Sequence, residues 1–119
     1  MQYLLLIYND EQTYWNLGED ERATLHAEYG SFTESIQTSG NMAGGAQLQP
    51  TSSATSVRVR NGETLVTDGP FAETKEALGG YYLFECSGLD EAAALAAQIP
   101  GAATGAIELR PAAEREEAA

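Results

Sequence analysis

Cationic side chains are scarce in this chain of 119 residues. Six Lys and Arg stand against eighteen Asp and Glu, which gives a formal net charge of −12 at pH 7. Binding to nucleic-acid phosphates or to an anionic membrane surface requires clustered positive charge. The composition therefore predicts that the protein binds neither a nucleic acid nor a membrane.

Cysteine and histidine are scarcer still, with one residue of each type, Cys86 and His26. One thiol excludes an internal disulfide, and one Cys with one His provides no tetrahedral ligand set for zinc. Cys86 lies in an apolar strand pattern, which predicts a buried and inert thiol. We expect no metal and no other cofactor.

The apolar run at the N-terminus, residues 3–8 (YLLLIY), is too short to cross a bilayer. It has neither a basic leader nor a small-residue cleavage site, so it indicates a strand and a cytoplasmic protein. The chain length predicts one domain, residues 1–111. Residues 112–119 form an acidic tail without the periodicity of a core element.

Hydrophobic periodicity predicts two helices and four to six strands, of which residues 42–48 are the weakest candidate. The strands are expected at residues 3–8, 42–48, 56–60, 63–67, 80–86 and 106–110, and the helices at residues 19–39 and 89–98. Residues 9–18 are expected to form a polar loop. Asn61-Gly62 is a strong signal for a two-residue hairpin turn between the third and fourth strands.

The longer expected helix carries one apolar stripe, made of Leu25, Tyr29, Phe32 and Ile36. His26 lies about 100° around the helix from Leu25, so it flanks that stripe. In the second helix, Ser87 three residues before Asp90 is consistent with a capping box.

The first strand and the strand at residues 80–86 have large apolar groups on both faces, yet two helices can cover only one face of a sheet. A second copy packed sheet against sheet would cover the other face. The sequence thus predicts an α+β fold. It is a ferredoxin-like antiparallel sheet with two helices on one face, in a homodimer of the dimeric α/β-barrel type.

Residues 68–82 (DGPFAETKEALGGYY) combine glycines and a proline, which constrain or free the backbone, with a cluster of charged side chains. Asp68 either accepts hydrogen bonds from its own turn or directs its carboxylate into a pocket as a general base or substrate anchor. Lys75 either pairs with Glu73 and Glu76 or binds an anionic ligand. Phe71 belongs either to the core or to a ligand-binding surface.

Other side chains also have two interpretations. Trp15, with Tyr14, forms either a pocket wall or a lid packed on the core. His26 is either a surface histidine or an acid/base group, which would need a carboxylate within hydrogen-bond reach. Arg58 and Arg60 share one strand face, where they either protect an edge strand or bind a carboxylate. Gly79-Gly80 is expected to serve a bulge or a close backbone approach.

Three parts of the chain together resemble the YCII-related superfamily, in the branch named after its DGPF motif. They are the YLLLIY strand, the segment GETLVTDGPFAETKEALGGYYLFE (residues 62–85), and Ile99-Pro100 with residues 107–111. The resemblance implies a ferredoxin-like fold and dimerisation. Members of this branch are often encoded beside extracytoplasmic-function sigma factors, which implies a regulatory or stress context. Some YCII-type relatives look like enzymes with a His–Asp pair, but His26 lies outside the DGPF motif.

Two functions are consistent with these observations. The first is a small dimeric protein that binds a small molecule in a pocket between the sheet and the first long helix. The alternative is a lyase- or hydrolase-like enzyme that uses Asp68 as general acid/base, assisted by Lys75 or His26.

Overall fold

The protein has an α+β fold whose main sheet is antiparallel. The computed structural model describes residues 1–113. The strands are β1 (Gln2–Asp10), β2 (Met42–Gln47), β3 (Thr55–Arg60), β4 (Glu63–Asp68), β5 (Glu76–Glu85) and β6 (Ala106–Pro111). The helices are α1 (Glu11–Trp15), α2 (Glu19–Ser39) and α3 (Leu89–Ala96), with short 3-10 turns at Thr51–Ser53 and Pro100–Ala103. The α+β class is therefore confirmed.

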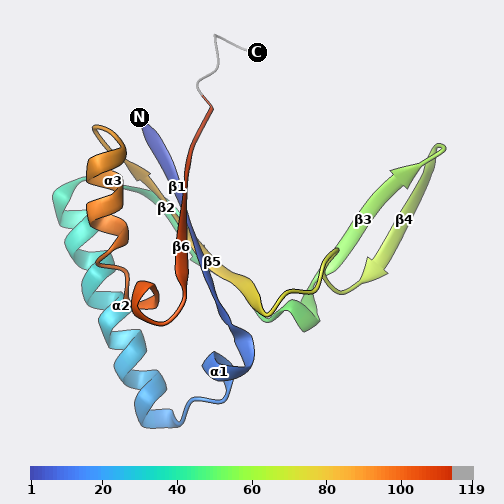
Figure 1. The fold of residues 1–119 in the computed structure, drawn as a ribbon, viewed down its shortest axis with the longest axis horizontal. Helices are drawn as coiled ribbons and strands as arrows, with labels where there is room; N and C mark the ends of the chain where they lie inside the picture. Colours follow the sequence, from blue (N-terminus) through green and yellow to red (C-terminus); the bar gives the residue numbers. More distant parts are fainter. Residues whose placement is uncertain (114–119) are drawn as a thin grey trace.

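Four strands form the main sheet in the order β2-β5-β1-β6. Helices α2 and α3 lie on one face of it (Figure 1). Tyr3, Leu5 and Ile7 of β1 point to that face and are buried with Phe32 and Ile36 of α2. The residues between them point to the opposite face, which none of the helices of residues 1–113 covers (Figure 1). We call this second surface the open face. It is made of Leu4, Leu6, Tyr8, Leu78, Tyr81 and Leu83 from β1 and β5, and of Glu108 and Arg110 from β6.

The core lies between the sheet and the two helices. Its largest fully buried side chains are Leu5, Ile36, Phe84 and Ile99. The alternation of buried and partly exposed residues along β1 and β5 is the period of two that a strand imposes. Gly79 is the extra residue at a shift in register, because Ile7 pairs with Gly80 while Tyr8 pairs with Leu78. The prediction of a bulge at Gly79-Gly80 is confirmed.

Two local predictions were wrong. The expected loop at residues 9–18 contains α1, which begins because the Asp10 carboxylate accepts hydrogen bonds from the backbone of Gln12 and Thr13. The expected capping box at Ser87 and Asp90 does not form. Gly88 is the N-cap of α3, and the Ser87 backbone N–H donates to the carboxylate of Glu91, one residue later.

Strands β3 and β4 form a separate two-stranded sheet that projects from the body on the side away from the helices (Figure 1). We call residues 55–68 the arm. Its tip is the Asn61-Gly62 turn, where both residues have positive φ (52° and 79°), as the two-residue hairpin requires. The hairpin prediction is confirmed, but the arm belongs to its own sheet.

The turn after β4 fixes the base of the arm. Gly69 has a φ of 94°, which a residue with a side chain rarely adopts. Its N–H donates to the carbonyl of Ala54 over 2.7 Å, and its own carbonyl accepts the Ser56 hydroxyl over 2.8 Å. The glycine of the DGPF motif therefore joins the start of β3 to the end of β4.

Cys86 is buried, as expected, with 4% of its surface exposed. Burial raises the pKa of the thiol above its ordinary value of 9.0, and the carboxylates of Glu91 and Glu85 act in the same direction. Burial likewise raises the pKa of Tyr29 above 10.0. None of the helices within residues 1–113 is long and apolar enough to span a membrane.

These raised pKa values predict a loss of stability in alkali. The folded protein holds both protons more tightly than the unfolded chain, so this stabilisation is fully present below about pH 9 and is lost as pH rises through the folded pKa values. Urea unfolding at pH 7, 9 and 10.5 should show a falling midpoint. At pH 8, Cys86 should react with a disulfide reagent only as fast as the protein opens, and rapid reaction of the native protein would contradict its burial.

Candidate functional site

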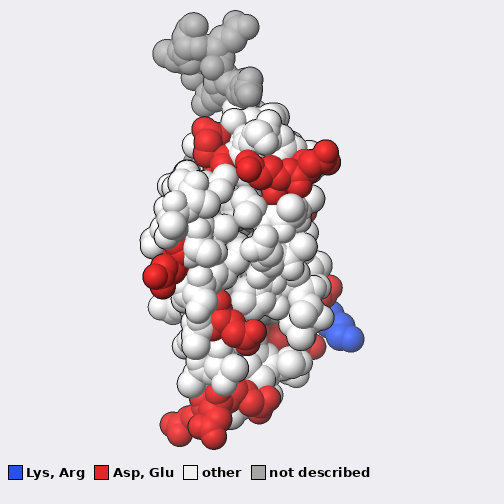
Figure 2. Space-filling model, turned by 90° about the vertical axis from the view of Figure 1, so that its left-hand side faces the viewer, with Lys and Arg blue, Asp and Glu red and all other residues white. Residues whose placement is uncertain are grey.

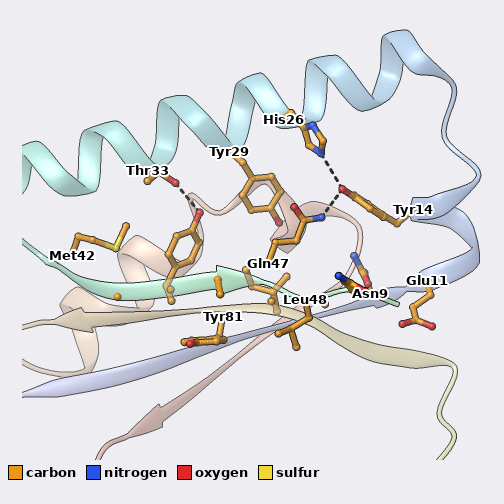
Figure 3. A pocket seen from close by; sticks show the side chains of 18 of the residues that line it. Asn9, Glu11, Tyr14, His26, Tyr29, Thr33, Met42, Gln47, Leu48 and Tyr81 are labelled. Atoms are coloured by element: carbon orange, nitrogen blue, oxygen red, sulfur yellow. Dashed lines mark hydrogen bonds between the residues drawn. The ribbon is translucent and has the colours of Figure 1, made fainter. Parts of the chain in front are cut away.

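A cavity of about 590 Å³ lies between α2 and the sheet, closed at one end by α1. Its side chains come from α1, α2, β1, β2 and β5 (Figure 3). The principal lining residues are Ile7, Asn9, Glu11, Tyr14, Trp15, His26, Tyr29, Thr33, Gln37, Met42, Gln47, Leu48 and Tyr82. This volume is within the range of small-molecule sites. The pocket is located where the sequence predicted it, between the sheet and the first long helix.

Three polar side chains meet at the α1 end of this cavity. The Tyr14 hydroxyl lies 3.1 Å from His26 Nε2 and accepts a hydrogen bond from Gln47 Nε2 over 2.8 Å (Figure 3). Tyr14 is on α1, His26 on α2 and Gln47 at the end of β2. We call these three residues the polar trio.

The direction of the Tyr14–His26 hydrogen bond depends on the proton at His26 Nε2. When Nε2 is bare it accepts a hydrogen bond from the phenol, and the phenol oxygen keeps one lone pair that can accept from another donor. When Nε2 carries a proton it donates to Tyr14, whose own proton becomes available to another acceptor. The polar trio can therefore present Tyr14 either as an acceptor or as a donor.

Arg22 packs against Tyr14 and Trp15, the two aromatic residues of α1 that line the cavity, and is not itself among the lining residues. Its guanidinium carbon lies 5.9 Å from the ring centroid of Tyr14 and 5.5 Å from that of Trp15. It also donates to the Trp15 carbonyl over 2.8 Å, and the two rings meet edge to face at 4.9 Å. These contacts hold Tyr14 and Trp15 in position, although α1 has only five residues.

Three hydroxyl groups, from Tyr29, Thr33 and Tyr82, lie toward the other end of the cavity. Thr33 and Tyr82 share a hydrogen bond of 2.9 Å, and the Tyr29 hydroxyl accepts the Gly101 N–H over 3.2 Å. Because that bond uses a lone pair, the phenol proton of Tyr29 stays available. A phenol is protonated at neutral pH, and burial raises the pKa of Tyr29 further.

Glu11 is the one formally charged side chain among the lining residues. Its two carboxylate oxygens accept hydrogen bonds from the Thr51 backbone N–H and hydroxyl, each over 2.7 Å. No Lys or Arg is among the lining residues of the described chain. An anionic ligand would thus find no cationic partner in the cavity.

The structure separates the six predicted site residues into two groups. His26 and Trp15 line the cavity. Asp68 ends the arm, and Phe71, Glu73 and Lys75 follow it in the loop to β5, so these four lie outside the lining. The side chain that hydrogen-bonds to His26 is that of Tyr14, and within residues 1–113 His26 forms no hydrogen bond with the carboxylate that an acid/base role would require.

Several of the alternative interpretations were wrong. Phe71 is 80% exposed, so it is not part of the core. Lys75 forms no ion pair with Glu73 or Glu76 in residues 1–113, where the ion pairs are Met1–Glu85 and Glu108–Arg110. The Asp68 carboxylate accepts no hydrogen bond from its own turn, whose geometry Gly69 sets instead. Roles for these residues in binding or catalysis remain predictions.

Sequence reasoning missed Gln47, Tyr29 and Thr33 as site residues. Tyr29 was assigned to the apolar stripe of α2, and its ring does pack against the core. Thr33 follows the buried Phe32 on the same helix. Gln47 lies in a weak, glycine-rich strand that carried no functional signal, although a glutamine at the end of such a strand is a candidate for hydrogen bonding.

Comparison with known proteins agrees with this fold. The sequence profile of the YCII-related domain matches residues 1–115. The chain belongs to the YCII-related family. A relative in Rhizobium meliloti (strain 1021), named uncharacterized protein R00369, is 44% identical over 117 residues, which cover 93% of this chain and 91% of the relative. The resemblance to the YCII-related superfamily is therefore confirmed.

Proposed function

We propose that this YCII-related protein binds an uncharged small molecule with an aromatic or aliphatic body in the cavity between α2 and the sheet. The observation that carries the proposal is the polar trio, because side chains from three elements meet at a single phenol at one end of a cavity whose walls also include Ile7, Trp15 and Met42. Such a combination of an apolar wall and a few placed polar groups is typical of ligand sites.

The charge of the cavity supports an uncharged ligand. Each carboxylate oxygen of Glu11 accepts one hydrogen bond from Thr51, and among the described lining residues there is no Lys or Arg. A carboxylate or phosphate would lose its hydration without gaining a counter-ion. A hydroxyl, carbonyl or amide group can instead bond to the polar trio, which offers both donor and acceptor positions.

The test uses two probes of nearly the same shape, one neutral and one anionic. We expect 4-hydroxybenzamide to bind more tightly than 4-hydroxybenzoate in isothermal titration calorimetry, with a matching change in the emission of Trp15, the one tryptophan in the chain. Gln47→Met should weaken binding of the amide about tenfold, the value of one neutral hydrogen bond. Gln12→Met, on the exposed side of α1, is the control. Preferential binding of the carboxylate would refute the proposal.

An enzymatic role is the second candidate, and the Tyr14–His26 hydrogen bond favours it. A phenol in contact with an imidazole can move a proton to or from a bound molecule. Asp68, the acid/base proposed from the sequence, lies on the arm outside its own chain's cavity. Chemical change of a bound probe during incubation, lost in His26→Gln, would favour the enzyme over a protein that binds without turnover.

The assembly proposed with this function is a two-fold dimer that joins the open faces. The strand order β2-β5-β1-β6, with α2 and α3 on one face, supports the ferredoxin-like arrangement expected from the sequence. Leu4, Leu6 and Leu83 leave an apolar patch on the uncovered face, and a second sheet could bury it. The proposed regulatory context rests on the resemblance to the DGPF branch.

A further inference from the structure

The arm displays an apolar surface that its own chain leaves uncovered. The register pairs Val57 with Val66 and Val59 with Thr64, which places the three valines on one face. Their exposed fractions are 61% for Val57, 59% for Val59 and 65% for Val66. The opposite face carries Arg58, Arg60 and Glu63, together with Leu65. We call the first surface the valine face.

This alternation is typical of a strand pair with one buried face and one solvated face. A hairpin of two strands without cover is marginally stable in water. Within residues 1–113, β3 and β4 pack mainly against each other, and the base of the arm is held where Gly69 bonds to Ala54 and Ser56. Its sequence is therefore suited to a contact that the single chain does not provide.

The position of the arm indicates what covers the valine face. The arm projects on the side of the sheet away from the helices, which is the side of the open face (Figure 1). A second copy that packed its sheet on the open face would lie about 10 Å away. A strand of six residues spans about 20 Å, so the arm is long enough to extend past that partner's sheet.

The distribution of charge favours a second copy as the partner. Residues 1–54 and 69–113 carry thirteen Asp and Glu against three Lys and Arg, a balance of −10. The arm, residues 55–68, carries two acidic residues, Glu63 and Asp68, against two cations, Arg58 and Arg60, a balance of 0. Acidic groups are spread over the helix side of the molecule (Figure 2). Two such bodies repel each other, and the arm is the part of the described chain that could approach an acidic body at least cost.

We propose that the arm of each copy packs its valine face on the body of a second copy, so that two arms clasp a two-fold dimer. This proposal rests on the open-face dimer proposed above and adds a second contact to it. Each copy supplies one arm and receives one, as a two-fold interface requires. The two contacts together contribute to the roughly 800 Å² per partner that a stable complex buries.

The test compares two arm variants that introduce the same charge at neighbouring positions. Val66→Glu places a carboxylate on the valine face, and Thr67→Glu places one on the opposite face. We expect the wild-type protein to be a dimer in analytical ultracentrifugation. Val66→Glu should raise the dimer dissociation constant at least tenfold, while Thr67→Glu changes it less than threefold. The near-ultraviolet circular dichroism of all three proteins checks that the core is intact.

Each result leads to one conclusion. A wild-type monomer at 100 μM would overturn both the open-face dimer and the clasp. A dimer that tolerates Val66→Glu would overturn the clasp alone and leave the open-face dimer in place. Equal weakening by Val66→Glu and Thr67→Glu would also overturn the clasp, because the effect would follow charge instead of the face. Selective weakening by Val66→Glu supports it.

Discussion

Replacement of Phe84 by alanine should lower the free energy of unfolding by about 3–5 kcal/mol. Phe84 has no exposed surface, and its ring packs against Phe32 and Tyr82 with centroid distances of 6.1 and 5.3 Å. Truncation would leave a cavity in the middle of the core, between β5 and α2. Since small domains are stable by only about 5–15 kcal/mol, the variant should unfold at a much lower urea concentration.

Phe71→Ala is the matched control, because it removes the same side chain from a position that is 80% exposed. We expect this variant to unfold within about 0.5 kcal/mol of the wild type. An equal loss of stability in the two variants would contradict the placement of Phe84 in the core and Phe71 outside it.

Gly105→Ala should destabilise the protein by about 2–3 kcal/mol through a steric clash. Gly105 immediately precedes β6, and a β-carbon there would collide with the backbone carbonyl oxygen of Tyr8 on β1. A carbonyl within a strand cannot rotate away as a side chain could, so β6 would have to separate from β1. Thermal unfolding followed by circular dichroism measures the effect.

Gly30→Ala makes the same chemical change where there is space. A β-carbon at Gly30 would meet nothing within 4 Å, and the residue lies in the middle of α2. Alanine should therefore stabilise the helix by about 0.5–1 kcal/mol. The two substitutions are thus expected to have opposite signs, and a shared sign would contradict the described contact between Gly105 and Tyr8.

The elements that could be predicted are those whose signals are local. Helix α2 has the bounds expected from its sequence, because acidic residues at its start, an apolar stripe and Gly40 at its end are all neighbours along the chain. The Asn61-Gly62 turn fixes the pairing of β3 with β4 in the same way. Helix α1 was missed although Asp10 is a good N-cap, since five residues are too few to show a helical period.

The sequence predicted where the candidate site lies, but only some of the residues that line it. His26 and Trp15 belong to the cavity, while Asp68 and Lys75 attracted interest through their motif and lie elsewhere. Gln47 is 33 residues from Tyr14 in sequence and 2.8 Å from it in space. A contact of this kind leaves no periodic signal, because it depends on how α1, α2 and β2 pack together.

The α+β class, the two faces of β1 and β5, and the hairpin turn of the arm could be inferred from the amino-acid sequence alone, since each depends on the spacing of near neighbours. Only the tertiary structure decided that the DGPF turn anchors the arm and that Tyr14, His26 and Gln47 meet over the sheet. The physical reason is that packing joins side chains across distances in sequence on which local propensity has no influence. The motif therefore identifies a turn that determines the fold, whereas the polar groups of the cavity come from positions outside any motif.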